Sequence, residues 1–214
     1  MNGLLKTLIK PDWDDNPKRS EILHAANLLQ VGEFQLIQLA YKVWYGEDLP
    51  EENIFVVGNT IVEPCKKILS KHLTGPKKCS HILMDIHRPE NFKDKNRLKN
   101  IIEYARTLSK IHGLSVKMLD FKRTRKHIEN FRIDMKGTEL IDLMSYIDFI
   151  KFQYHSKFII SDSGTAQEEP ALLNTPVLVP RGYTERPQSV DNECSVMVDV
   201  NSINNGTWFK SYQF

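Results

Sequence analysis

A polar cluster directly follows a predicted buried strand in the last third of the chain. The apolar run Phe158-Ile159-Ile160 predicts that strand, and residues 161–169 follow it with the sequence SDSGTAQEE. Ser163 and Gly164 predict a turn into a helix over residues 164–173, whose first N–H groups lack partners inside the helix and can face an anion. Gly164 allows a phosphate to approach the backbone, and the hydroxyls of Ser163 and Thr165 can cap the helix or donate to ligand oxygens. The pattern therefore indicates a diphosphate site, with a plain helix cap as the alternative.

Four further residues could complete such a site. Glu169 lies in the same predicted helix, where a carboxylate can accept hydrogen bonds from ribose hydroxyls, whereas we expect Glu168 to be a solvated acid. Arg186 follows the next strand and can offer a bidentate guanidinium to a diphosphate, with a surface arginine as the alternative. Phe149 and Tyr146, on the preceding helix, could stack on a base or belong to the core.

A histidine follows another predicted strand. The sequence HRPEN at residues 87–91 begins where the strand at residues 81–86 ends. Open α/β sheets gather their ligands at the carboxyl ends of their strands. His87 could therefore act on a proton or a phosphate oxygen, although a lone histidine is usually structural or merely exposed.

The elements that must position these residues alternate between strand and helix. We expect strands at 54–57, 81–84, 114–119, 139–143, 158–161 and 176–179, and helices at 61–70, 96–112, 124–131, 145–155 and 164–173. The alternation predicts an α/β fold with a doubly wound, mostly parallel sheet. We expect a helical N-terminal segment of unassigned role at residues 1–49, a ligand-binding domain at 50–200 and a loosely packed tail at 201–214.

Composition argues against several other classes of protein. The 214 residues include 29 Lys and Arg against 27 Asp and Glu, and the net charge of +2 gives no global field that favours nucleic acid or an anionic membrane. No apolar run approaches the ~20 residues that span a bilayer, and no secretory signal is evident, so we expect a cytoplasmic protein. Cys65, Cys79 and Cys194 lack the spacing of a zinc site or a disulfide framework, so we expect reduced, buried thiols and no metal or redox cofactor.

In their types and order, these motifs resemble those of the non-hydrolysing UDP-N-acetylglucosamine 2-epimerases. The similar segments are residues 50–60, 87–91, 162–169 and 184–187. The family has two Rossmann-like domains in the GT-B arrangement, and the resemblance implies that this chain holds the C-terminal, Rossmann-like half with a short helical appendage. The implied reaction interconverts UDP-N-acetylglucosamine and UDP-N-acetylmannosamine by elimination and re-addition of UDP.

The resemblance also implies a role for individual residues. His87 corresponds to a catalytic-site histidine, Glu169 to the ribose contact and Phe149 to the uracil pocket, while the remaining positions serve the diphosphate. The implied ligand is UDP or UDP-N-acetylglucosamine, held by Phe149, Ser163, Gly164, Thr165, Glu169 and Arg186.

Some family features have no counterpart in the sequence. The family's catalytic carboxylates and first phosphate-binding arginine lie in an N-terminal domain that residues 1–49 do not resemble, so we expect a truncated member. Thr165 stands where the family usually has glycine, and Phe121 stands where it has a histidine. Four hypotheses stay open: a working epimerase; a UDP-sugar-binding half that needs a partner chain with the N-terminal domain, or a homodimer; an inactive remnant; and a GT-B glycosyltransferase domain.

Overall fold

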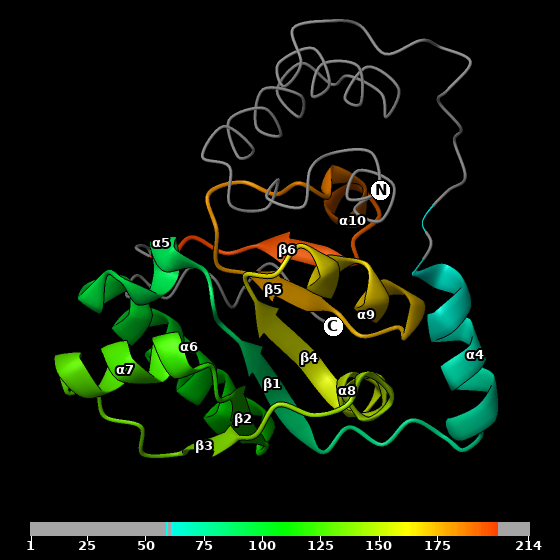
Figure 1. Ribbon diagram of the computed structural model, residues 1–214, viewed down its shortest axis with the longest axis horizontal. Coiled ribbons are helices and arrows are strands. Elements are labelled where there is room, and N and C mark those ends of the chain that lie inside the picture. Colours follow the sequence, from blue (N-terminus) through cyan, green and yellow to red (C-terminus); the bar gives the residue numbers. More distant parts are fainter. Residues whose placement is uncertain (1–58, 60, 201–214) are drawn as a thin grey trace, which may run out of the picture.

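Six parallel strands form the centre of the computed structural model, which describes residue 59 and residues 61–200 (Figure 1). Their order in the sheet is β3-β2-β1-β4-β5-β6, so the order reverses between β1 and β4. This arrangement confirms the predicted α/β fold with a doubly wound parallel sheet. The strands are β1 (His81–Asp85), β2 (Ser115–Leu119), β3 (Thr138–Ile141), β4 (Ser156–Ser161), β5 (Val177–Val179) and β6 (Ser195–Met197).

Helices cover both faces of the sheet (Figure 1). The long helix α6 begins at the N-cap Asp94, whose side chain accepts a hydrogen bond from the backbone N–H of Arg97, and ends at Gly113 with φ of 65°. The predicted helix at 96–112 is thus confirmed to within one residue. The helices are α4 (Val62–His72), α5 (Pro89–Phe92), α6 (Lys95–His112), α7 (Lys122–Phe131), α8 (Tyr146–Tyr154), the 3₁₀ helix η3 (Thr165–Gln167), α9 (Glu169–Leu172) and α10 (Pro187–Asp191).

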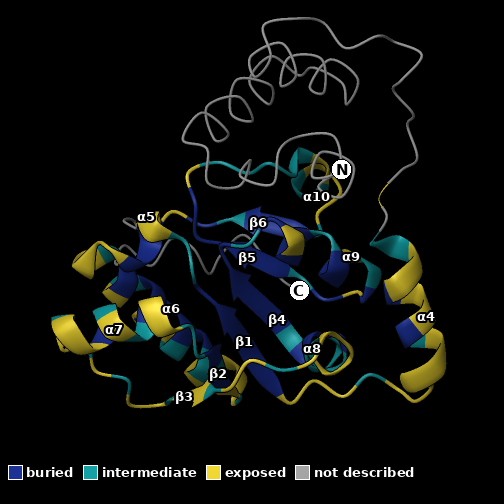
Figure 2. Cartoon of the chain, viewed as in Figure 1, coloured by how far each residue is buried: buried dark blue, intermediate teal, exposed yellow. Residues whose placement is uncertain are grey.

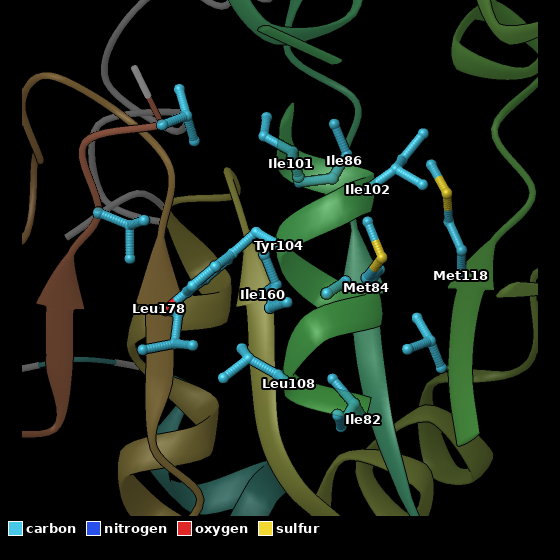
Figure 3. Packing of buried hydrophobic residues seen from close by; sticks show 14 of the residues in the cluster. Ile82, Met84, Ile86, Ile101, Ile102, Tyr104, Leu108, Met118, Ile160 and Leu178 are labelled. Atoms are coloured by element: carbon cyan, nitrogen blue, oxygen red, sulfur yellow. The ribbon is translucent and has the colours of Figure 1, made fainter. Parts of the chain in front are cut away.

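Successive side chains of the strands enter two separate cores. Ile82 and Met84 of β1 pack in the larger core with the apolar face of α6 (Figure 3). Leu83 faces the other side of the sheet, where Phe149 and Phe152 of α8 cover it. Full burial of each such side chain stabilises the fold by about 1.5–3 kcal/mol. Because both faces are covered, the central strands are buried along their length (Figure 2).

The predicted helix at 164–173 is wrong, because the segment forms two short helices instead. The 3₁₀ helix η3 is followed by the four-residue helix α9. Pro170 has no N–H to donate to a carbonyl one turn back, and its ring crowds that carbonyl, so a continuous α-helix cannot run through it. The strand predicted at 139–143 ends two residues earlier, at Ile141, and sequence patterns missed α5, α10 and the edge strand β6.

Some predictions concern segments outside the described residues, and the prediction of three buried cysteines needs correction. The predicted strand at 54–57 and the segments 1–49 and 201–214 lie outside the described residues. All three cysteines are free, but only Cys65 is buried, whereas Cys79 is exposed in the connection before β1. Within residues 61–200, no helix combines the length and apolar character required to traverse a bilayer.

Candidate functional site

The carboxyl ends of three neighbouring strands carry the predicted site residues. Asp85, the last residue of β1, is paired in register with Ser161, the last residue of β4. His87 and Ser163 therefore each lie two residues beyond the ends of adjacent strands. On the other side of β4, β5 leads into the loop that carries Arg186. The topology thus gathers at one edge of the sheet residues that are far apart in the sequence.

Asp162 joins the loops that follow β1 and β4. Its fully buried carboxylate accepts hydrogen bonds from the backbone N–H groups of His87 and Arg88, both at 3.0 Å, and from the side-chain amide of Asn91 at 2.8 Å. Burial raises the pKa of Asp162, against the effect of His87 and of the Asn91 amide. Asp162 therefore fixes the start of the His87 loop relative to Ser163.

Ser163 and Gly164 form one wall of the candidate diphosphate cradle. The φ angle of Gly164 is −65°, so its backbone does not require glycine. A Cβ atom at this position would lie 3.9 Å from Nη2 of Arg186 and 3.8 Å from Oε2 of Glu185. Both distances are ordinary van der Waals contacts, so the protein itself leaves room for a Cβ atom here, and glycine would be required only by a ligand that approaches the backbone. The hydroxyl of Thr165 lies 3.0 Å from that of Ser163, so Thr165 adds a second hydroxyl at the rim of the cradle.

Arg186 lies against this wall but is already engaged by carboxylate and carbonyl oxygens. Its Nε donates to Glu168 and its Nη1 donates to the backbone carbonyl of Glu185 at 2.9 Å. The side chain of Glu168 is only 12% exposed. The expectation of a solvated Glu168 is therefore wrong, because Arg186 folds back over the start of α9 and pairs with it.

Gln167 connects the two loops that form the cradle. Its side-chain carbonyl accepts a hydrogen bond from Thr184 Oγ1 at 2.6 Å, and its amide nitrogen donates to the backbone carbonyl of Ser163 at 3.4 Å. Thr184 also accepts a hydrogen bond from the backbone N–H of Arg186 at 3.0 Å. The buried Gln167 thus sets the position of the Arg186 loop relative to Ser163.

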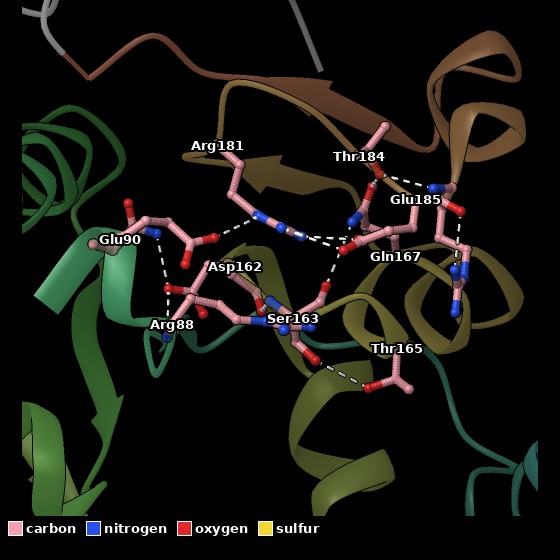
Figure 4. A network of polar contacts seen from close by, with 12 residues as sticks. Arg88, Glu90, Asp162, Ser163, Thr165, Gln167, Arg181, Thr184 and Glu185 are labelled. Atoms are coloured by element: carbon pink, nitrogen blue, oxygen red, sulfur yellow. Dashed lines mark hydrogen bonds and ion pairs between the residues drawn. The ribbon is translucent and has the colours of Figure 1, made fainter. Parts of the chain in front are cut away.

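A second arginine organises the same edge of the sheet (Figure 4). Arg181, whose side chain is 2% exposed, pairs with Glu185 at 2.8 Å and with Glu90 at 3.2 Å. Burial alone would raise the pKa of Glu185, but the charge and hydrogen bond of Arg181 lower it, so the ion pair stays charged. Arg88 belongs to the same network, and its buried Nε has no hydrogen-bond partner among the described residues.

His87 is held from one side of its ring. Nδ1 lies 2.8 Å from Oδ1 of Asp85 and 3.6 Å from Oδ1 of Asp162, and the ring packs against Phe121 with a centroid separation of 5.0 Å. Burial alone would lower the pKa of His87, but Asp85 and Asp162 outweigh burial and raise it. The side chain stays 31% exposed, so a ligand can reach it.

Glu169 begins α9 and Phe149 belongs to α8, two helices that contact each other. The buried carboxylate of Glu169 accepts hydrogen bonds from Gln153, at 2.9 Å, and from Tyr146. Burial raises the pKa of Glu169 despite these two donors. Phe149 is half-buried and packs on the core cluster that contains Leu83. A ribose contact at Glu169 would therefore use a carboxylate that α8 already orients.

Sequence reasoning gave no role to three residues that build this edge. Asp85, Asp162 and Gln153 are polar residues buried in or beside apolar elements. A polar residue in a predicted buried strand, such as Asp85 after HILM, is the signal that could have identified them, because a buried carboxylate needs hydrogen-bond partners. Partners that distant in sequence cannot be read from spacing.

A pocket of about 330 Å³ borders the cradle. Arg186 and Glu168 line it together with residues of α4, α9 and α10, whereas Ser163 and His87 do not. The pocket therefore extends away from the strand ends. Among the described residues, no group of three or more His, Cys, Asp and Glu side chains is placed to hold a metal ion.

Comparisons with known proteins identify relatives of the whole described region. A family model described as UDP-N-acetylglucosamine 2-epimerase matches residues 23–205. The UDP-N-acetylglucosamine 2-epimerase of Methanocaldococcus jannaschii is 31% identical over an alignment of 170 residues that covers 72% of this chain and 46% of that protein. The UDP-N-acetylglucosamine 2-epimerase of Neisseria meningitidis is 32% identical over an alignment of 162 residues that covers 67% of this chain and 42% of that protein.

A solved structure agrees with these sequence matches. The UDP-GlcNAc 2-epimerase of M. jannaschii, in complex with UDP-GlcNAc and UDP, superimposes with a TM-score of 0.65 at 27% identity, covering 78% of this chain and 49% of that one. The chain spans about half the length of the curated relatives that it matches. With a family match over most of its length, the chain belongs to the UDP-N-acetylglucosamine 2-epimerase family.

Proposed function

We propose that residues 50–200 form a UDP-sugar-binding domain that contributes one side of a UDP-N-acetylglucosamine 2-epimerase active site. The observation that carries this proposal is the convergence of His87, the Ser163-Gly164 turn and Arg186 at the carboxyl ends of β1, β4 and β5. Open α/β sheets bind their ligands where the strand order reverses, which in this chain is between β1 and β4.

The cradle supplies the donors that a diphosphate needs. The hydroxyls of Ser163 and Thr165 lie 3.0 Å apart, the guanidinium of Arg186 lies near Gly164, and Gly164 has no side chain to block a phosphate from the backbone. A diphosphate would compete with Glu168 for Arg186, since both are anions. In this proposal Glu169 accepts from the ribose hydroxyls, and the apolar surface at Phe149 serves the uracil base.

The proposed reaction inverts the configuration at C2 of the sugar. A base removes the C2 proton, the electron pair of that C–H bond forms the C1=C2 bond, and the C1–O bond breaks as UDP leaves with its electron pair. Re-addition of UDP to C1 and of a proton to the other face of C2 completes the inversion. The cradle stabilises the charge that develops on the departing diphosphate, and His87 lies where a proton or a phosphate oxygen can be contacted.

We propose that the carboxylates for the proton transfers come from an N-terminal domain, on a partner chain or on a longer form of this one. The relatives that this chain matches are about twice the length of the matched region. UDP binding is expected from the domain itself, whereas epimerisation is expected only when such an N-terminal domain is also present.

Calorimetric titration of UDP into the purified chain tests this proposal. Saturable binding should be weakened about tenfold or more by Arg186→Ala, which removes a charged donor, and about fivefold by Ser163→Ala, which removes a neutral one. The matched control is Arg106→Ala, because Arg106 pairs with Asp134 on the surface of α6, away from the strand ends.

Two outcomes would contradict the assignment. A folded chain that gives no heat at millimolar UDP would remove the binding role. Binding that is equally weakened by Arg106→Ala would show that the cradle is placed wrongly. Incorporation of deuterium at C2 of UDP-N-acetylglucosamine, followed by NMR in D₂O, then reports whether a chain that supplies the N-terminal domain restores the reaction.

A further inference from the structure

Asp85 is a buried carboxylate that ends β1 directly before the His87 loop. Its Oδ1 lies 2.8 Å from Nδ1 of His87, and its Oδ2 accepts a hydrogen bond from Ser161 Oγ at 3.0 Å. The residue is 5% exposed. Each carboxylate oxygen thus has one partner, which is His87 in the loop after β1 for Oδ1 and Ser161 on the neighbouring strand β4 for Oδ2.

This geometry distinguishes the two nitrogens of the imidazole. Nδ1 faces the carboxylate at hydrogen-bond distance, so Nδ1 carries the proton of the neutral ring and donates a hydrogen bond to Asp85. Phe121 packs against the ring at 5.0 Å. Nε2 is then the ring nitrogen that a ligand on the exposed side would meet.

The charged groups around the ring favour its protonated form. The carboxyl groups of Asp85, at the end of β1, and Asp162, after β4, raise the pKa of His87, while Arg88, next along the loop, opposes them. Phe121, which comes before α7, brings no charge. Two nearby carboxylates against one guanidinium offset the cost of burial, and the pKa of His87 is raised.

We propose that Asp85, itself held by Ser161, is a positioning residue that fixes His87 with a proton on Nδ1 and keeps Nε2 directed to the ligand. When the ring carries a proton on both nitrogens, Nε2 donates a hydrogen bond to an oxygen of the bound nucleotide sugar. The role of Asp85 towards the ligand rests on the proposed function. The Asp85–His87 pair itself can be tested without any ligand.

Nitrogen NMR of the histidine rings in the full chain gives the first test. The His87 signals are assigned by their loss in His87→Gln. The proposal expects the Nδ1–H tautomer for the neutral ring in the wild-type chain, and a titration midpoint that falls by about one pH unit or more in Asp85→Asn. The matched control is Asp134→Asn, an exposed aspartate between α7 and β3 that pairs with Arg106, which should leave the midpoint unchanged.

The inference would be overturned by the Nε2–H tautomer in the wild-type chain, or by equal midpoints in the wild-type chain and Asp85→Asn. The tautomer decides the question even if Asp85→Asn does not fold. Neither reading depends on UDP, so a chain that fails to bind UDP would refute the proposed function and leave this result standing.

The pH dependence of UDP binding separates positioning from a structural role. At a pH between the two titration midpoints measured by NMR, the Asp85→Asn chain should bind UDP about tenfold more weakly than the wild type, because only the wild-type His87 is protonated there. At a pH below both midpoints the difference should shrink, because His87 is then protonated in both chains. A loss of affinity that is the same at both pH values would mean that Asp85 only supports the fold, and would refute the positioning role.

Discussion

Asp162 offers a quantitative test of how the edge of the sheet is held together. The change Asp162→Ala removes a fully buried carboxylate and leaves the N–H groups of His87 and Arg88 and the amide of Asn91 without their acceptor. Each buried donor without a partner costs about 1–3 kcal/mol. If water that enters the vacated space satisfies one of them, the free energy of unfolding should fall by about 3–5 kcal/mol.

Asp162→Asn refines this test because it removes less. One oxygen remains to accept, while the new amide group faces a donor, so a loss of about 1–3 kcal/mol is expected. Since burial raises the pKa of Asp162, part of this loss is offset by removal of a charge that is costly to bury. The stability should therefore decrease in the order wild type, Asn, Ala.

Urea unfolding followed by far-UV circular dichroism at 25 °C measures the three free energies by linear extrapolation. Asp134→Ala, which changes an exposed aspartate on the surface, serves as the control. An Asp162→Ala chain that unfolds within about 1 kcal/mol of the wild type, with the same dependence on urea, would refute the reasoning. It would mean that the three donors find other partners and that Asp162 does not hold the two loops.

Three further outcomes follow from particular residues. Glu168→Gln should tighten UDP binding by about three- to tenfold in calorimetry, because it releases Arg186 from its anionic partner. Weaker binding would show that Glu168 positions the arginine instead. Burial, aided by Lys117, lowers the pKa of His81 to about 4 from an ordinary 6.5. As the pH falls, the histidine is therefore protonated in the unfolded chain before it is protonated in the folded chain. The contribution of His81 to stability should be full above pH 6.5 and should fall as the pH drops towards 4. Urea midpoints measured across that pH range should fall less in His81→Gln than in the wild type. Burial raises the pKa of Cys65 to about 11, so iodoacetamide at about pH 8 should label the exposed Cys79 and spare Cys65 in peptide mass spectra, and equal labelling would contradict the buried position.

Local sequence patterns predicted most of the fold because they depend on neighbours in the chain. The helix at 96–112 was predictable from one apolar face and a glycine that ends it, and the strand at 81–84 from a short apolar run. The edge strand β6 escaped because three residues that pair with only one neighbouring strand carry too little periodicity. The single helix predicted at 164–173 does not form because Pro170 interrupts it, so a 3₁₀ helix and a short α-helix take its place.

The candidate site was predictable in its residue types but not in its internal contacts. Strand ends placed His87, Ser163 and Arg186 at one edge, because parallel strands share the direction of their carboxyl ends. No spacing rule pairs Glu168 with Arg186 or Asp85 with Ser161, since those contacts depend on side-chain direction after the strands have assembled. The expectation that Glu168 is solvated was wrong for this reason.

The amide of Gln167 has a consequence for the energetics of binding. Because one side chain holds both the Ser163 turn and Thr184 of the Arg186 loop, the conformational entropy of those loops is lost during folding rather than when a ligand arrives. A ligand that enters a cradle already ordered keeps more of its interaction free energy as affinity. The backbone of the two loops should therefore superimpose closely between the free and the nucleotide-bound protein, and adaptation to the ligand should be confined to the side chains of Arg186 and Glu168.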